Sequence, residues 1–146
     1  MTPRFRNVDV ASPDPDQWPF EAVLAAIERG TLSDWRVIAA TIRANPWGPC
    51  ARAVETITGW NENYGVDRLL EGIIEKARHD ADAESRREYG ARIRTVRTSL
   101  GMTMREFAPL IGTSAARLAS YESGKVAPTA NILGRVDRLQ RTHRVG

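Results

Sequence analysis

The sequence predicts an all-α protein in which an N-terminal helical bundle is followed by a second helical domain. Two observations predict this class. Apolar residues recur three and four positions apart in successive stretches, which is the spacing of amphipathic helices, and Gly, Pro and Asn separate these stretches. The chain has 146 residues, which is enough for one or two compact domains with modest cores.

Composition changes after the first seventeen residues. Residues 1–17 are rich in Pro, Asp and Ser and lack periodicity, so we expect an irregular arm there. Residues 18–80 carry the periodic stretches of about four helices, which we interpret as a region for oligomerisation or for binding a partner protein. Residues 81–146 form the second predicted domain.

Each helix of the bundle has its own start and stop signals. Pro19 suits the first position of a helix that ends before Gly30, and Ser33 can cap the next helix. NPWGP at residues 45–49 ends that second helix, and its last proline can open a third that closes at Gly59. VDRLLEGIIEKAR predicts the fourth. The apolar stripes, in chain order, are Val23, Leu24 and Ile27; Trp35, Ile38, Ala39 and Ile42; Ala53, Val54 and Ile57; and Leu69, Leu70, Ile73 and Ile74.

The segment between the two domains, RHDADAESRRE, is highly charged and contains neither Gly nor Pro. Two interpretations are open. It is either a flexible hinge or a helical connection between the fourth helix and the second domain. We favour a helical connection with a break near Asp80–Asp82.

Residues 103–124, TMREFAPLIGTSAARLASYESG, contain two short amphipathic segments that flank Gly112. Glycine tolerates the positive φ of a tight interhelical turn, and Ala108 is small where two helices would cross. Thr103 and Ser114 stand where N-caps are needed. The pattern predicts a helix-turn-helix unit. Its apolar positions are Met104, Phe107, Ala108, Ile111, Leu118 and Tyr121.

The same part of the chain resembles the lambda-repressor-like (Xre/Cro) family of DNA-binding domains. The runs YGARIRTVR, LGMT, REFAPLIG, TSAARLASYESG and APT follow the family pattern without a gap, and the resemblance covers roughly residues 84–140. It implies that residues 81–146 bind double-stranded DNA and that the protein acts as a homodimer on an operator.

The resemblance also implies where bases are read. The recognition helix should begin at Ser114, and its first residues and the next turn should face the major groove. The implied base-facing residues are Ser114, Ala115, Ala116, Arg117 and Ser120. Phage repressors of this type carry glutamines at such positions, which bond adenine in pairs, whereas alanine offers only methyl contacts. Strong direct readout is therefore not expected.

The sequence offers more side chains for contacts to phosphates than for contacts to bases. The helix that opens at Thr103 can present backbone N–H groups, and the expected phosphate-contacting residues are Thr103, Arg105, Lys125 and Thr129. Four arginines recur at three-residue spacing near the C-terminus: Arg135, Arg138, Arg141 and Arg144. We interpret them first as a solvated face, with a secondary phosphate role or a dimer contact as the alternative.

One pair of charges is expected to be architectural. Arg97 matches the family arginine that pairs with the glutamate matched here by Glu122, and this pair would tie the first helix of the domain to the end of the recognition helix. Periodicity also places four residues of that first helix on the face that packs against the helix-turn-helix unit: Tyr89, Ile93, Val96 and Leu100.

Charge differs between the two halves. Residues 1–80 hold nine Arg or Lys and twelve Asp or Glu, a net charge of −3. Residues 81–146 hold twelve basic and six acidic residues, a net charge of +6, which is typical of a domain that binds a polyanion. The alternative is that the use of nineteen Arg against two Lys reflects coding bias, but bias does not explain why acidic residues are scarce in the second half.

Enzymatic and membrane functions find no support. His79 and His143 have no spaced carboxylate or cysteine for a metal site, and Cys50 is expected to be a small buried side chain rather than a reactive thiol with a lowered pKa. No phosphate-cradling glycine loop is present. We therefore expect neither catalysis nor a cofactor. Without an apolar run or a secretory signal, we expect a cytoplasmic, nucleoid-associated protein and no membrane contact.

All four tryptophans lie in the first half: Trp18, Trp35, Trp47 and Trp60. Most should be core anchors, and we expect Trp47 to be exposed and to bind a partner. The stretch SDWRVIAATIRANPWGPCARAV also resembles, more weakly, helix-turn-helix antitoxins paired with nucleotidyltransferase-like toxins. Two functions stay open: an antitoxin that neutralises a toxin and represses its own operon, or a stand-alone transcriptional repressor.

Overall fold

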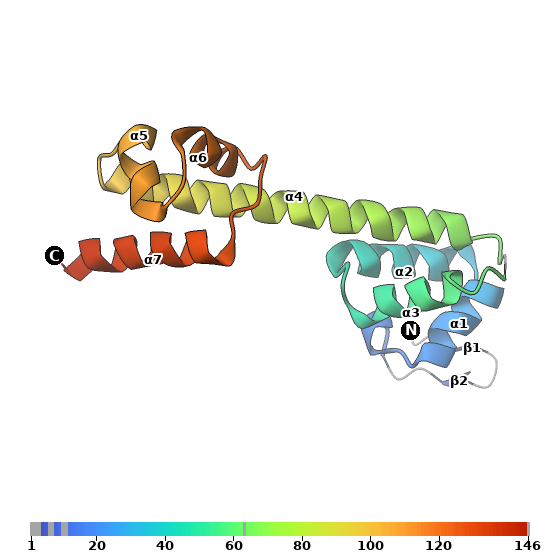
Figure 1. Cartoon of the computed structure of the whole chain (residues 1–146). Helices are drawn as coiled ribbons and strands as arrows, with labels where there is room; N and C mark the ends of the chain where they lie inside the picture. The colour runs from blue at the N-terminus through green and yellow to red at the C-terminus, as the bar shows by residue number, and fades with distance from the viewer. Residues whose placement is uncertain (1–3, 6–7, 10–11, 63, 146) are drawn as a thin grey trace. The chain divides into compact units, whose positions relative to one another are not determined.

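The computed structural model describes residues 4–5, 8–9, 12–62 and 64–145. Within them the chain has seven α-helices, two 3-10 helices and one pair of two-residue strands, so the predicted all-α class is confirmed. The chain divides into two compact units, which we call unit 1 (residues 1–81) and unit 2 (residues 82–146), as Figure 1 shows.

Unit 1 contains the four expected helices: α1 (Phe20–Arg29), α2 (Leu32–Ala44), α3 (Pro49–Thr58) and the first part of α4 (Asp67–Ser99). Pro49 opens α3, as its position after NPWG predicts. The start of α2 differs from the expectation. Thr31 rather than Ser33 caps this helix, because the Thr31 N–H donates to the Asp34 carboxylate at 2.8 Å in a capping box.

The described part of the N-terminal arm is more ordered than the irregular arm that the sequence predicts. It contains an antiparallel pair, β1 (Arg4–Phe5) and β2 (Val8–Asp9), and a 3-10 helix, η1 (Pro15–Gln17). Asp14 caps η1 by accepting the Asp16 N–H at 3.0 Å. The Asp16 carboxylate in turn accepts the Cys50 N–H at 3.0 Å and the Asn45 amide at 3.1 Å. Periodicity cannot reveal contacts between residues so far apart in sequence.

The core of unit 1 is built from the apolar stripes of its helices, except that Leu69, which the sequence assigns to the stripe of the fourth helix, is exposed. Trp18 is buried, and Trp35 lies at the edge of the core, where its indole N–H donates to the Ala26 carbonyl at 2.8 Å. Cys50 is buried as well. Desolvation, followed by the charge of nearby Asp16, raises the pKa of its thiol to about 12, so the thiol stays protonated at neutral pH.

Helix α4 runs from Asp67 to Ser99 without interruption, so the predicted break near Asp80–Asp82 is wrong. No Gly or Pro stands between Gly72 and Gly90, and nothing in that stretch removes a backbone donor. Surface pairs within the helix also support it, such as Lys76–Asp80 at 2.8 Å.

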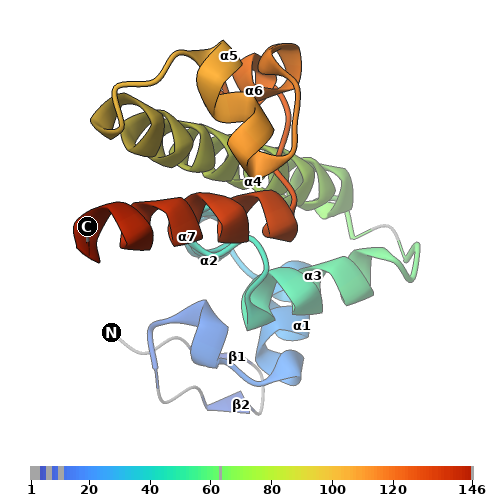
Figure 2. The ribbon, with the colours of Figure 1, turned by 60° about the vertical axis from the view of Figure 1, so that its left-hand side comes forward.

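Unit 2 contains the rest of α4 together with α5 (Met104–Phe107), the 3-10 helix η2 (Ala108–Ile111), α6 (Ala115–Glu122) and α7 (Ala130–Val145). Figures 1 and 2 show α5 and α6 on one side of the second half of α4 and α7 on another. Their inward faces form a separate core: Ile93, Val96, Phe107, Ala108, Ile111, Leu118, Tyr121, Ile132 and Val136.

Two glycines shape unit 2. Gly112 follows η2 with φ of +71°, so it makes the left-handed turn between the two helices of the helix-turn-helix unit. Gly90 lets α4 approach α6, because a Cβ atom at this position would lie 2.3 Å from the Tyr121 carbonyl oxygen. Tyr89, which the sequence assigns to the packed face of α4, is instead exposed, because Gly90 takes the close-contact position beside it.

Neither a membrane-spanning helix nor a metal-binding cluster occurs among the described residues. None of their helices is both long and apolar enough to cross a membrane. They also contain no group of three or more His, Cys, Asp or Glu side chains that could hold a metal ion.

Candidate nucleic-acid interface

The predicted base-facing residues lie at the N-cap and in the first two turns of α6. Ser114 is the N-cap, and its hydroxyl oxygen accepts the Arg117 N–H at 3.1 Å. Ala116 and Arg117 are exposed, whereas Ala115 and Ser120 are half-buried. The outer surface of α6 therefore presents small side chains, with Arg117 the only long polar one among the five predicted positions.

The Arg117 side chain is oriented by a contact within its own helix. Its Nε donates to the Tyr121 hydroxyl at 3.0 Å, one turn further along α6. Tyr121 belongs to the buried core of unit 2, so it provides a fixed acceptor. This contact draws the Arg117 guanidinium along the helix surface and leaves its two terminal nitrogens available as donors.

Among the predicted phosphate-contacting residues, Thr103 has a local partner that the sequence analysis leaves out. Thr103 and Glu106 form a capping box in which the Thr103 N–H donates to the Glu106 carboxylate at 3.1 Å, and the Thr103 hydroxyl accepts the Glu106 N–H at 3.2 Å. Hydrogen bonds from Thr103 hold the pKa of Glu106 below its ordinary value. The start of α5 thus already carries a carboxylate, which makes its N–H groups less available to a phosphate.

The other three predicted phosphate-contacting residues are exposed. Arg105 lies on α5, and Lys125 follows α6 in the loop that leads to α7. Thr129 caps α7, since its hydroxyl oxygen accepts the Ile132 N–H at 3.2 Å. These side chains come from three different elements of unit 2, and all three are accessible to a large ligand.

The structure contains the expected pair of Arg97 and Glu122. The Arg97 guanidinium meets the Glu122 carboxylate in a two-point contact, with distances of 2.8 Å from Nε and 2.9 Å from Nη2. A third bond runs from Nη1 to the Met102 carbonyl at 2.9 Å. The hydrogen bonds to Glu122 raise the pKa of Arg97, so its guanidinium stays charged. It joins α4 to the end of α6 and is not available to DNA.

Several contacts that the sequence analysis missed also hold α6 and α7 in place. Arg92 on α4 forms an ion pair with Asp137 on α7, and Arg86 Nε donates to the Gly124 carbonyl at 3.1 Å. Arg135 on α7 donates through Nη1 to the Ile111 carbonyl at 3.2 Å, at the end of η2. No sequence signal singles out Arg135 from the other arginines at its three-residue spacing.

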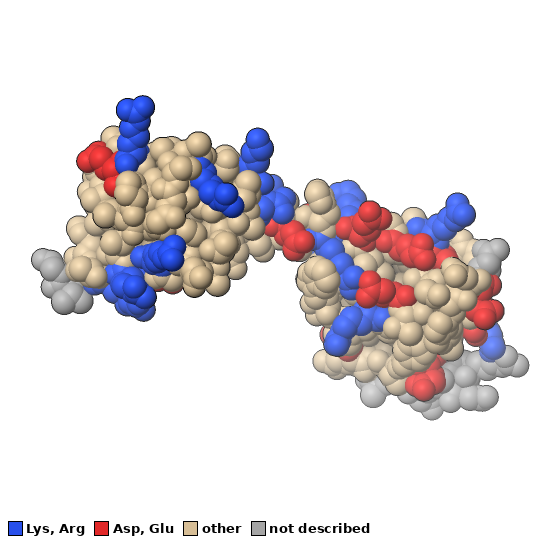
Figure 3. All heavy atoms as spheres, in the orientation of Figure 1, with Lys and Arg blue, Asp and Glu red and all other residues tan. Residues whose placement is uncertain are grey.

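The two units differ in net charge. Ala81 is uncharged, so the counts for residues 1–80 and 81–146 give unit 1 a net charge of −3 and unit 2 a net charge of +6. On the face drawn in Figure 3, Asp and Glu gather over unit 1, whereas Lys and Arg predominate over unit 2. The potential of unit 2 therefore favours a polyanion.

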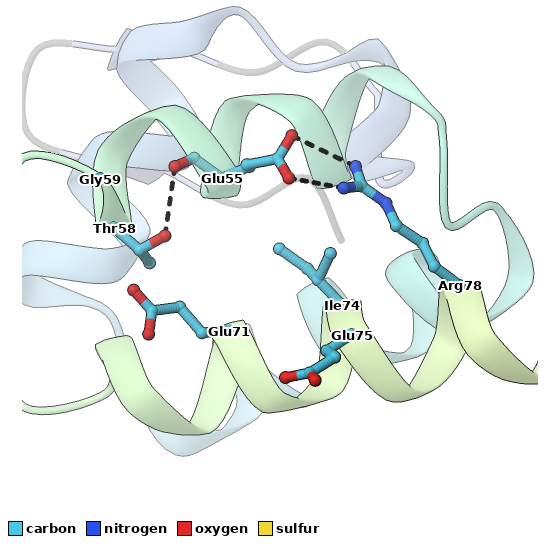
Figure 4. A pocket seen from close by; sticks show the side chains of 7 residues that line it. All are labelled: Glu55, Thr58, Gly59, Glu71, Ile74, Glu75 and Arg78. Carbon is cyan, nitrogen blue, oxygen red and sulfur yellow. Dashed lines mark hydrogen bonds and ion pairs between the residues drawn. The ribbon is translucent and has the colours of Figure 1, made fainter.

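Unit 1 exposes aromatic and acidic side chains. Trp47, the tryptophan predicted to be exposed, has 57% of its surface accessible, and the Arg78 guanidinium lies 4.2 Å from its ring centroid. Trp60 is also exposed and contacts Phe20 edge-on. Between α3 and α4 lies a groove of about 410 Å³, shown in Figure 4, with Ile74 at its base. Glu71 and Glu75 line one side, and Glu55 is paired with Arg78.

Comparison with known proteins agrees with the geometry of unit 2. Residues 93–139 match the family model described as helix-turn-helix, a match that begins on α4 and ends on α7. No curated protein and no solved structure matches the chain. The matched family consists of DNA-binding regulators rather than enzymes. Residues 93–139 are therefore a helix-turn-helix domain of the lambda-repressor-like family, and the protein is a DNA-binding regulator of transcription.

Proposed function

We propose that the protein is a sequence-specific repressor that binds its operator as a homodimer through unit 2 and captures a second protein through unit 1. In this proposal it is an antitoxin that neutralises a toxin and represses its own operon. The alternative is a stand-alone repressor without a toxin partner. DNA binding would keep the protein on the nucleoid, in the cytoplasm.

The observation that supports operator binding most directly is the way α6 is presented. Ser114 caps its start, the Arg97–Glu122 pair holds its end, and Ala116 and Arg117 in its first turn are exposed. A recognition helix enters the major groove with its first residues against the base edges. Small side chains at Ala115 and Ala116 allow close approach, with methyl contacts to thymine as the expected readout.

The proposed homodimer follows from the short reach of one recognition helix. A single α6 contacts only one half-site, and proteins with this motif combine two half-sites about one helical turn apart. Two copies of unit 2, each with a net charge of +6, would neutralise phosphates on both sides of the operator.

Selection from a pool of random duplexes by the full-length protein tests this proposal. We expect a palindromic site, and light scattering of the complex should give two protein chains per duplex. The same duplex with its half-sites moved by half a helical turn is the control, and it should bind no more tightly than a scrambled duplex of the same length. A preferred site without symmetry, bound by one chain, would contradict the dimer.

The proposed protein partner is supported by the surface of unit 1. Tryptophan is enriched at protein–protein interfaces. Trp47 and Trp60 are both exposed and so are accessible to a partner. Glu71 and Glu75 line the groove of Figure 4 with no arginine or lysine within ion-pair distance among the described residues. With its net charge of −3, unit 1 fits a basic partner, such as a protein that itself acts on RNA or nucleotides.

Purification of the tagged full-length protein from its source cells would identify this partner. The purified partner should then bind the wild-type chain more tightly than a Trp47→Ala, Glu71→Gln, Glu75→Gln variant. That variant should bind DNA as the wild type does, which serves as its control. If the full-length protein retains no partner encoded beside it, the antitoxin proposal is wrong and the stand-alone repressor remains.

A further inference from the structure

A second groove lies within unit 2, between α6 and α7. It has a volume of about 590 Å³, and its lining includes Arg117 from α6, Arg135 from α7 and Thr113 from the turn before α6. Both helices begin at this groove, because their caps, Ser114 and Thr129, line it as well. The groove therefore borders the same α6 that the helix-turn-helix architecture presents to DNA.

Hydrogen bonds to neutral acceptors orient both arginines. Arg117 Nε donates to the Tyr121 hydroxyl at 3.0 Å, and Arg135 Nη1 donates to the Ile111 carbonyl at 3.2 Å. Among the described residues neither guanidinium lies within ion-pair distance of a carboxylate, unlike Arg92 and Arg97 in the same unit. Each therefore has several free N–H donors and no carboxylate beside it, while its position is already restricted.

The rest of the lining adds donors and no carboxylate. The oxygens of Ser114 and Thr129 already accept backbone N–H groups, so their hydroxyl hydrogens can be donated to a ligand. Asn131 contributes a side-chain amide. Two oriented guanidinium groups with hydroxyl and amide donors around them match an anion with several acceptor oxygens, and phosphate is the anion that arginine recognises best in this way.

We propose that this groove binds a phosphate group, held between Arg117 and Arg135, and that the group belongs to the DNA backbone beside α6. The proposal rests on the proposed DNA binding and gives Arg117 a different role. Arg117 contacts phosphate and sets the position of α6, whereas the resemblance implies that it faces bases. Arg135 then has a different role from the other three arginines at its spacing, Arg138, Arg141 and Arg144, because these do not line the groove.

Glutamine substitutions test the proposal in the full-length protein. Arg117→Gln removes the charge and keeps an N–H donor for Tyr121, because the glutamine amide nitrogen takes the place of Nε. Arg135→Gln removes the charge together with the Nη1 donor to the Ile111 carbonyl. Arg138→Gln is the matched control, because it removes one arginine charge from the same helix at a position outside the groove. Thermal melting checks that each variant is folded. The probe is a labelled random-sequence duplex of about 30 base pairs, roughly three helical turns.

We expect each groove variant to weaken binding about tenfold, and the double variant to reduce the slope of log K against log salt by about one phosphate. The loss should be the same for an operator duplex and for a scrambled one, because phosphate contacts carry no sequence information. Arg138→Gln should change binding by less than about threefold, since an exposed charge away from the contact acts only through a screened field. Equal losses in all three variants would overturn the assignment to DNA.

The phosphate group could also come from a small molecule, such as free phosphate or a nucleotide. A second measurement distinguishes this source from the DNA backbone. If inorganic phosphate raises the melting temperature of the wild type but not of the double variant, while DNA affinity is unchanged in the variants, the groove binds a small phosphate compound and the DNA assignment is wrong. No effect in either measurement overturns the phosphate site altogether. A wild-type protein that binds no DNA at low salt instead refutes the proposed function, and the phosphate measurement still tests the groove.

Discussion

The Arg97–Glu122 pair differs from the surface ion pairs of the chain in its burial. Only 14% of the Arg97 side chain and 5% of the Glu122 side chain are exposed. Removing one partner of such a pair leaves the other charge desolvated, which costs about 3–5 kcal/mol for a fully buried pair. We therefore expect Glu122→Ala to destabilise unit 2 by about 3 kcal/mol in urea denaturation, and to weaken DNA binding only through the loss of folded protein.

Glu84→Ala is the control for this prediction. Glu84 pairs with Arg87 on α4, where 58% and 62% of the two side chains are exposed. An exposed pair is worth about 0–1 kcal/mol. Similar losses in the two variants would contradict the structural role of Glu122. Lost DNA binding with unchanged stability of the Glu122 variant would make Glu122 a direct DNA contact instead.

Replacing glycine by alanine should have opposite effects on protein stability at two positions of α4. In a helix interior, alanine is more favourable than glycine by about 0.5–1 kcal/mol. A Cβ atom at Gly72 meets nothing within 4 Å, so Gly72→Ala should stabilise the protein by about this amount. At Gly90 the added atom would lie 2.3 Å from the Tyr121 carbonyl oxygen, and backbone must move to admit it.

We expect Gly90→Ala to destabilise unit 2 by about 1–3 kcal/mol, the usual cost of overpacking. Thermal melting of the two variants measures the difference directly. If Gly90→Ala stabilised the protein as Gly72→Ala does, the close approach of α4 to α6 would be incorrect.

At the scale of elements, α5 is a helix of only four residues, and its capping box contributes to its stability. The folded-state pKa of Glu106 is lowered, so its contribution is complete above the ordinary pKa of glutamate and is lost as the pH falls through the lowered value. We expect Glu106→Gln to be less stable than the wild type at neutral pH. The difference should shrink as the medium becomes more acidic. A stability gap that is independent of pH would show that the carboxylate charge plays no part.

The positions of the helices are largely predictable from the sequence, because each of them buries an apolar stripe at helical spacing. The helix-turn-helix unit is the clearest case: Gly112, with its positive φ, and the N-cap Ser114 are both local signals. Prediction fails where a contact joins distant residues. Asp16 orders the arm by bonding to Cys50, and Gly90 displaces Tyr89 from the packed face because α6 passes so close.

The candidate site shows the same limit. The pairing of Arg97 with Glu122 follows from a resemblance, but the role of Arg135 depends on the Ile111 carbonyl, which is brought to it only by the fold. The capping box of Thr103 is a local pattern and could be read from the sequence, since a Glu stands three residues after the Thr. The break expected in α4 is an error of another kind. The charged segment there contains neither Gly nor Pro, and this local signal already indicates the continuous helix that the structure shows.

At the scale of the whole molecule, binding to DNA should be dominated by phosphates. Unit 2 has a net charge of +6, whereas the residues of α6 that are predicted to face bases are mainly alanine and serine. Each neutralised phosphate releases counterions, and the logarithm of the affinity then falls linearly with the logarithm of the salt concentration, with a slope of about −0.9 per phosphate. Base contacts through methyl groups add little discrimination, because they lack the paired hydrogen bonds that distinguish one base from another.

We therefore expect a steep salt slope together with a small ratio of affinities for the operator and for a scrambled duplex. Titration of both duplexes between about 50 and 200 mM salt measures the two quantities in one experiment. Ala115→Gln and Ala116→Gln provide a comparison, because glutamine restores a side chain that can bond adenine in pairs. These variants should change which sequence is preferred while leaving the salt slope unaltered. A large affinity ratio combined with a shallow slope in the wild type would show that base contacts, and not the phosphates, hold this protein on its operator.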